Sequence, residues 1–184
     1  MKLTNIYQTV EDRGNLREAT KHGPFFCSKK DDSGIVKKGT REPWLGEGYY
    51  FWDSFIEDAK WWGREAYQNN YYIFETQYDQ HSEYLFDTLG DLTMLQEFEE
   101  YANALRKTYR GKSLTVSFVI EYLKRNTDFS EKYKAIRMFP YSTKKRQPSL
   151  YFPGKKAQFL EVERVQICFF DKTLLVYPYK YVSL

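Results

Sequence analysis

The chain has 184 residues, of which 42% are hydrophobic, 29% charged and 19% aromatic, and its formal net charge at pH 7 is +3. No stretch approaches the ~20 apolar residues of a membrane helix, and the N-terminus is too polar for a signal peptide. Two histidines and two distant cysteines, Cys27 and Cys168, exclude a disulfide framework and make a zinc site or metal catalysis unexpected. We expect one domain over residues 1–184, a cytoplasmic location, no membrane contact and no metal.

Along the first half of the chain, the sequence predicts strands and helices in mixed order. We expect strands over Leu3–Thr9, Phe25–Ser28, Tyr49–Trp52 and Tyr71–Tyr78. A short helix is expected over Asn15–His22, a polar loop over Lys29–Pro43, and a longer helix from Ser54 to Asn69-Asn70. Ser54 and Glu57 have the spacing of a capping box, which predicts that the helix begins there. Its expected buried face consists of Ile56, Ala59, Trp62 or Gly63, and Ala66.

The second half begins with helices and ends in strands. Apolar residues at three- and four-residue intervals predict a helix over about Leu92–Lys107 and a second helix containing Val116 to Leu123. The strands expected after them are Ala135–Pro140, Leu150–Phe152, Ala157–Leu160, Val162–Phe170 and Leu174–Tyr181. Because there is no regular βαβ alternation, the fold class expected is α+β.

The segment Trp44-Leu45-Gly46-Glu47-Gly48-Tyr49-Tyr50-Phe51-Trp52 is the most informative part of the chain. Gly46 and Gly48 allow a tight turn and close approach of the backbone to a flat ligand, and aromatic residues follow at once. The glycines lead into a strand and lack a following Gly-Lys-Ser/Thr, which argues against a P-loop and a Rossmann phosphate site. Taken alone, two glycines before a strand also fit an ordinary turn.

This segment resembles the Gly-x-Gly-x-Tyr-Phe motif of ADP-ribosyltransferases of the poly(ADP-ribose) polymerase and diphtheria toxin type. In that family the tyrosine is followed, on the next helix, by a small residue and a second aromatic, and the two aromatics sandwich nicotinamide. Tyr50, Ala59 and Trp61 have this spacing. The resemblance implies an ADP-ribosyltransferase-like split β-sheet core with flanking helices and an NAD site that includes Gly46 and Gly48.

Two further motifs of the family have matching positions with altered residues. Gln8 and Thr9 stand where the family has His and Gly, which hold NAD, and the resemblance implies the same role here. Gln166 stands where the family has its catalytic Glu. An amide keeps the hydrogen bond to the ribose but loses the charge, so slower chemistry or a carboxylate from elsewhere is expected. Glu161 and Glu163 also match the Glu-x-Glu of arginine-modifying toxins, and Glu163 is a further catalytic candidate, although strand alternation turns both away from Gln166.

The resemblance implies an NAD-dependent mono-ADP-ribosyltransferase, a bacterial toxin or phage-defence factor that transfers ADP-ribose to a protein or nucleic acid and has a possible antitoxin partner. In this reading Tyr50 and Gln166 act in catalysis, and weak basic clusters favour a nucleic acid slightly. The altered residues Gln8 and Gln166 support an alternative. In it the same fold has lost its chemistry and binds a nucleotide, a nucleic acid or a protein.

Overall fold

The computed structural model describes residues 1–31, 33–37, 42–110, 114–140, 149–151, 158–160 and 164–183. The described elements are β1 (Leu3–Glu11), α1 (Leu16–His22), β2 (Phe26–Cys27), β3 (Gly48–Asp53), α2 (Ile56–Tyr67), β4 (Tyr71–Asp79), β5 (Leu85–Asp87), α3 (Leu92–Thr108), α4 (Val116–Asn126), α5 (Phe129–Lys132), β6 (Ala135–Met138), β7 (Ser149–Tyr151), β8 (Gln158–Leu160), β9 (Gln166–Phe169) and β10 (Leu175–Val182). None of the helices in these ranges is long and apolar enough to span a bilayer. The fold is α+β, as the mixed order of elements predicted.

The main sheet has eight strands in the order β10-β4-β1-β3-β9-β6-β5, with β2 paired to β3 off this path. Its strands pair antiparallel except β5 and β6, which are parallel, and β7 and β8 form a separate antiparallel pair. β1 pairs with β4 along its whole length, but it pairs with β3 only through Ile6↔Asp53 and Tyr7↔Trp52. Beyond Tyr7 and Trp52 the two strands separate, and we call this place the split.

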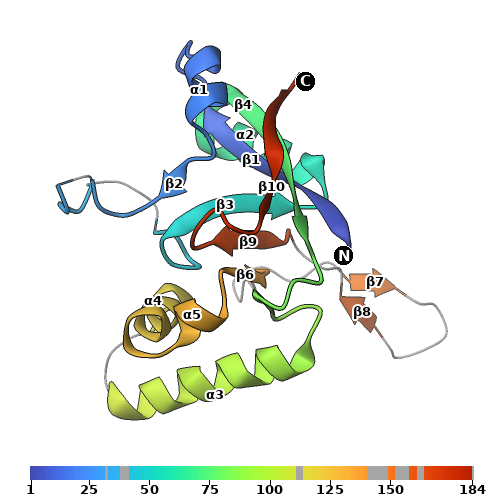
Figure 1. Cartoon of the computed structure of the whole chain (residues 1–184). Helices are drawn as coiled ribbons and strands as arrows, with labels where there is room; N and C mark the ends of the chain where they lie inside the picture. The colour runs from blue at the N-terminus through green and yellow to red at the C-terminus, as the bar shows by residue number, and fades with distance from the viewer. Residues whose placement is uncertain are drawn as a thin grey trace.

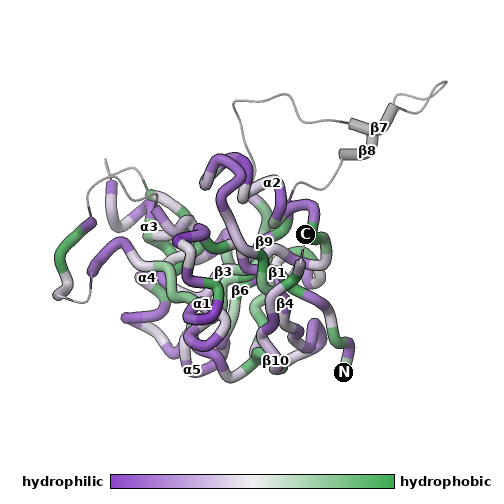
Figure 2. The backbone as a smooth tube through the Cα atoms, turned by 90° about the horizontal axis from the view of Figure 1, so that it is seen from above, coloured by the Kyte–Doolittle hydropathy of each residue, from purple (hydrophilic) through white to green (hydrophobic). Residues whose placement is uncertain are grey.

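The helices cover the sheet in two groups (Figure 1). α3, α4 and α5 lie beside β6 and β9, whereas α1 and α2 lie near β1 and β4. Hydrophobic stretches gather in the central strands, and the hydrophilic ones lie mostly on peripheral helices and loops (Figure 2). One buried cluster joins the first helix group to β6 and β9, and another packs α2 against β1, β3 and β4. The split lies between these two groups of helices.

The turn from β3 into α2 corrects one expectation. Ser54 does not cap the helix: its φ is +63°, and its hydroxyl donates to Asp53 Oδ1 at 3.1 Å. α2 begins at Ile56, and Phe55 at its N-cap makes no side-chain cap hydrogen bond. The reversal of direction directly after β3 requires the left-handed backbone at Ser54, so the capping-box prediction was wrong.

Other differences concern short elements and strand ends. β9 contains only Gln166 to Phe169, so the described part of the predicted strand Val162–Phe170 is shorter than expected, and residues 161–163 lie outside the described ranges. β5 and α5 were not predicted. Both have fewer than five residues, which is too short for a hydrophobic period to emerge.

A buried ion network joins β3, β5 and β6. The Arg137 guanidinium lies 2.7 Å from Asp53 Oδ2 and 3.0 Å from Asp87 Oδ1, and the Tyr78 hydroxyl lies 3.4 Å from Asp53 Oδ1. Burial alone would lower the pKa of Arg137, but the two carboxylates raise it above its ordinary value. Asp53 points to the face of β3 opposite Trp52, so the network fastens the sheet behind the split.

Candidate functional site

The side-chain amide of Gln8 bridges the split. Its Nε2 donates to the carbonyl oxygens of Phe25, at 3.1 Å, and Tyr50, at 3.2 Å. Its Oε1 accepts from the Phe25 N–H and from the Tyr179 hydroxyl, both at 2.9 Å. Gln8 is only 6% exposed, and these four hydrogen bonds use both amide hydrogens and both oxygen lone pairs. The Gln8 side chain therefore makes hydrogen bonds that the backbone would make in a continuous ladder. It has no donor or acceptor left for a ligand.

The backbone of Thr9 faces the split. In an antiparallel strand, alternate residues direct their N–H and C=O groups to opposite neighbours. The carbonyl of Lys2 accepts from Gln80, which follows β4, whereas the carbonyl of Asn5 accepts from Ser54, which follows β3. By this alternation the N–H and C=O of Thr9 point toward β3, where the ladder has already ended. No hydrogen bond to these two groups is found within the described part of the chain.

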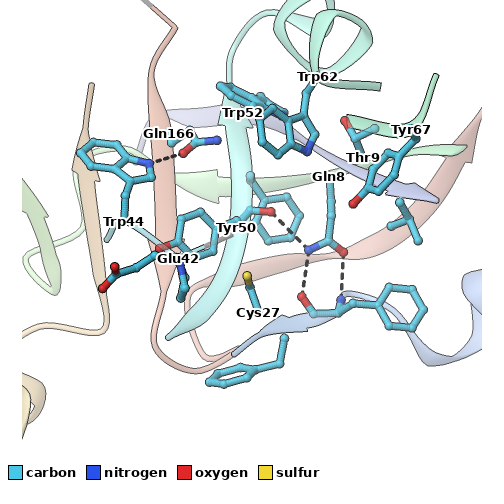
Figure 3. Close-up of a pocket in the computed structure, with 15 residues that line it drawn as sticks. Gln8, Thr9, Cys27, Glu42, Trp44, Tyr50, Trp52, Trp62, Tyr67 and Gln166 are labelled. Carbon is cyan, nitrogen blue, oxygen red and sulfur yellow. Dashed lines mark hydrogen bonds between the residues drawn. The ribbon is translucent and has the colours of Figure 1, made fainter. Parts of the chain in front are cut away.

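A cavity of about 300 Å³ lies at the split (Figure 3). Residues of β1, β2, β3, α2, the loop before β3 and the first position of β9 line it. Its lining consists of Gln8, Thr9, Val10, Phe25, Phe26, Cys27, Glu42, Pro43, Trp44, Tyr50, Phe51, Trp52, Trp62, Tyr67 and Gln166. Aromatic side chains predominate, with a few convergent polar groups, which is the usual character of a small-molecule site.

Tyr50 forms one wall of this cavity as a neutral ring. Its hydroxyl accepts from the Leu45 N–H at 2.8 Å and donates to the Gly46 carbonyl at 2.7 Å. Burial raises the pKa of Tyr50 far above its ordinary value. Tyr50 therefore offers a fixed surface for stacking, and its hydroxyl stays protonated at neutral pH.

The two glycines support this wall and do not line the cavity. Gly46 has φ +82°, and a Cβ there would lie 2.6 Å from Glu121 Oε1. A Cβ on Gly48 would lie 2.5 Å from the Phe169 carbonyl oxygen. α4 holds the turn from outside, since Glu121 Oε1 accepts from the Glu47 N–H at 2.9 Å. The glycine loop thus shapes the site through the backbone.

Two neighbouring tryptophans on α2 have different surroundings. Trp62 lines the cavity, together with Trp52. Trp61, expected at the nicotinamide, does not line it: the Arg164 guanidinium covers its ring at 3.9 Å from the centroid, and its ring packs edge-on to Trp52. The small residue Ala59 is fully buried, and its carbonyl accepts from the Thr9 hydroxyl at 2.8 Å, which ties α2 to β1.

Gln166 reaches the cavity from β9. Its Oε1 accepts from the indole N–H of Trp44 at 2.5 Å, and in the ladder it pairs with Trp52. In Figure 3 its amide nitrogen lies on the side away from Trp44. Glu161 and Glu163, the alternative acidic candidates, lie outside the described residues.

The structure thus brings Gln8, Thr9, Tyr50 and Gln166 together at one cavity, with Ala59 directly behind it. Sequence reasoning did not assign the cavity residues Trp44, Trp62, Tyr67, Cys27 and Glu42 to the site. Trp44 opens the glycine segment, the helical period offered Trp62 as a buried-face position, and Glu42 lies in the predicted polar loop, whereas nothing in the sequence singles out Tyr67 and Cys27.

The charged groups near the site are few. Glu42 is the one acidic residue in the described lining, and it forms an ion pair with Lys29 at 2.7 Å. In the described ranges, no three His, Cys, Asp or Glu residues are placed to hold a metal ion. Comparison with known proteins adds nothing further, because no family model, curated protein or solved structure matches the chain.

Proposed function

We propose that the chain is an NAD-dependent mono-ADP-ribosyltransferase with an ADP-ribosyltransferase-like split sheet, and that the cavity holds the nicotinamide end of NAD. The observation that carries this proposal is the backbone of Thr9. Its N–H and C=O face a cavity walled by the rings of Tyr50, Trp52 and Trp62. A planar aromatic carboxamide has both the faces to stack on such rings and the donor and acceptor to pair with one peptide group.

The size and chemistry of the cavity fit one end of a dinucleotide. A volume of about 300 Å³ is at the small end for ligand pockets, so the rest of NAD would extend beyond it. NAD supplies the ADP-ribose group, and nicotinamide is the leaving group. The chain contributes stacking by Tyr50 and Trp62, hydrogen bonding by Thr9, and a polar contact from Gln166.

We expect a low rate of transfer, because Gln166 places a neutral amide at the cavity where a carboxylate would stabilise the developing positive charge. Glu42 lies at the same cavity but is engaged by Lys29. A slow transferase that acts on a protein or nucleic acid in the cytoplasm suits a toxin or defence factor. An antitoxin partner would then keep such an enzyme in check.

Labelled NAD tests the proposal. Incubation with cell lysate should transfer label, and the purified chain should bind NAD. Trp62→Leu should weaken NAD binding about tenfold through lost stacking. Trp61→Leu is the matched control, because the Arg164 guanidinium already covers the Trp61 ring. Folded wild-type protein that neither transfers label nor binds NAD would refute the proposal. If Trp61→Leu weakens NAD binding more than Trp62→Leu does, nicotinamide stacks on Trp61 and not on Trp62.

A second candidate is a non-catalytic module that binds a nucleotide, a nucleic acid or a protein. The hydrogen bonds of the two glutamines favour it. All four hydrogen bonds of the Gln8 amide go to protein groups, and the side-chain carbonyl of Gln166 already accepts from Trp44. NAD binding without nicotinamide release, in wild type and in Gln166→Glu, would support the module. Turnover that is lost in Tyr50→Ala and Gln166→Ala, with both variants folded, would exclude it.

A further inference from the structure

The contact between Trp44 and Gln166 joins residues 122 positions apart and decides which polar group Gln166 presents. An indole N–H donates and cannot accept, so the atom that it meets must be the amide oxygen. Oε1 is thereby held toward Trp44, and Nε2 is left on the opposite side (Figure 3). No hydrogen bond from Nε2 is found among the residues that the structure describes.

Trp44 is itself held in place, so the contact does not depend on a free side chain. Its ring packs against the core cluster beneath α3, α4 and α5. The next residue, Leu45, donates its N–H to the Tyr50 hydroxyl, and the Gly46 N–H closes a turn onto the Pro43 carbonyl at 2.9 Å. The indole therefore forms a rigid donor at the rim of the cavity.

We propose that Trp44 is a positioning residue that orients the Gln166 amide so that the cavity offers its ligand an N–H donor at this point. The ligand group that binds there is therefore a hydrogen-bond acceptor. This assignment of the ligand rests on the proposed function: in NAD, the acceptor is an oxygen of the ribose next to nicotinamide. Trp44 acts through Gln166 and needs no contact with the ligand to do so.

The orientation is tested first without any ligand. In a ¹H–¹⁵N spectrum of the full chain, the Trp44 indole resonance should shift upfield in Gln166→Met, and its proton should exchange faster, because the acceptor is gone. The indole resonances of Trp61 and Trp62 are internal controls and should move less. A Trp44 indole resonance that is unchanged in position and exchange would overturn the proposal.

A double-mutant cycle then tests the effect on the ligand. Trp44→Phe keeps an aromatic side chain but replaces the indole with a smaller phenyl ring that has no N–H, and it should weaken NAD binding about fivefold, the worth of one hydrogen bond. In the Gln166→Met background the same change should have little further effect, because Trp44 would act only through residue 166. A Trp44→Phe effect that remains about fivefold in the Gln166→Met background would show that the two residues act independently and would overturn the proposal.

The two levels of hypothesis fail separately. If the folded wild type binds no NAD, the proposed function fails, while the indole spectrum still tests whether Trp44 orients Gln166. If NAD binds but the cycle is additive, the proposed function stands and the positioning role is refuted. Urea midpoints of all four proteins confirm that each one is folded during the measurement.

Discussion

Replacing Gln8 by Met tests whether a single side-chain amide holds the split together. Met has a similar length and volume but cannot make the hydrogen bonds of an amide. The substitution removes all four contacts, to both backbone groups of Phe25, the Tyr50 carbonyl and the Tyr179 hydroxyl. The strand β2 would then keep its short ladder to β3 and the edge-on contact between the Phe26 and Tyr49 rings.

The expected loss follows from the number of bonds and their surroundings. Each hydrogen bond contributes roughly 0.5–1.5 kcal/mol net, which gives about 2–6 kcal/mol for four. Phe25 and Tyr50 line the cavity, so water can bind some of the backbone groups that lose their partner in Gln8. We therefore expect the free energy of unfolding to fall by about 2–4 kcal/mol. This is a large share of the ~5–15 kcal/mol by which domains are stable.

Urea unfolding measures this loss. With a slope of about 2 kcal/mol per molar urea, the midpoint of Gln8→Met should fall by roughly 1–2 M. The Phe25 amide, which donates to Gln8 Oε1, should also exchange with solvent faster than in wild type. The midpoint reports on the whole fold, whereas the exchange of the Phe25 amide reports on the bridge across the split.

A second glutamine provides the control. Gln77 on β4 is half-buried and makes one side-chain hydrogen bond, from Nε2 to Asn5 Oδ1 at 2.7 Å. Gln77→Met should cost less than about 1 kcal/mol. If Gln8→Met costs no more than Gln77→Met, the amide does not hold the split, and our reading of the site is refuted.

Three further predictions concern charge and thiol chemistry. Arg137→Met should lower the free energy of unfolding by about 3–5 kcal/mol because it leaves Asp53 buried and unpaired, and adding Asp53→Asn should restore part of the loss in urea unfolding; a loss below about 1 kcal/mol would contradict it. Burial alone would raise the pKa of Glu121, but hydrogen bonds from Lys124 and a backbone N–H lower it below its ordinary 4.5. Its stabilising effect is therefore present above that value and lost as pH falls through the lowered pKa, so Glu121→Gln should be less stable than wild type by about 1–2 kcal/mol at pH 7 and equal to it in acid; a pH-independent difference would contradict the assignment. Iodoacetamide should reach the exposed side chain of Cys27 but modify it slowly, since partial desolvation by the surrounding cavity residues raises the pKa of its thiol, and it should spare buried Cys168. Saturating NAD should slow the reaction of Cys27 further, and an unchanged rate would show that NAD does not occupy the cavity.

The sequence alone predicted the α+β class and the outline of the central unit. Glycines before an aromatic run, followed by a helical period, predict a turn, a strand and a helix, and these are β3 and α2. Such signals are local, because strand and helix periods are set by neighbours a few residues apart. The start of α2 was misplaced because the left-handed turn at Ser54 depends on how β3 and α2 must meet.

The make-up of the site was decided by tertiary structure. The sequence marks both Gln8 and Gln166 as altered motif positions, but only the fold shows one filled by Phe25 and Tyr50 and the other bound to Trp44. Likewise, α2 carries adjacent tryptophans, and which of them faces the cavity depends on the rotation of the helix against β1. Hydrogen bonds between residues 17 to 122 positions apart leave no periodic trace in a sequence, so only the folded chain reveals them.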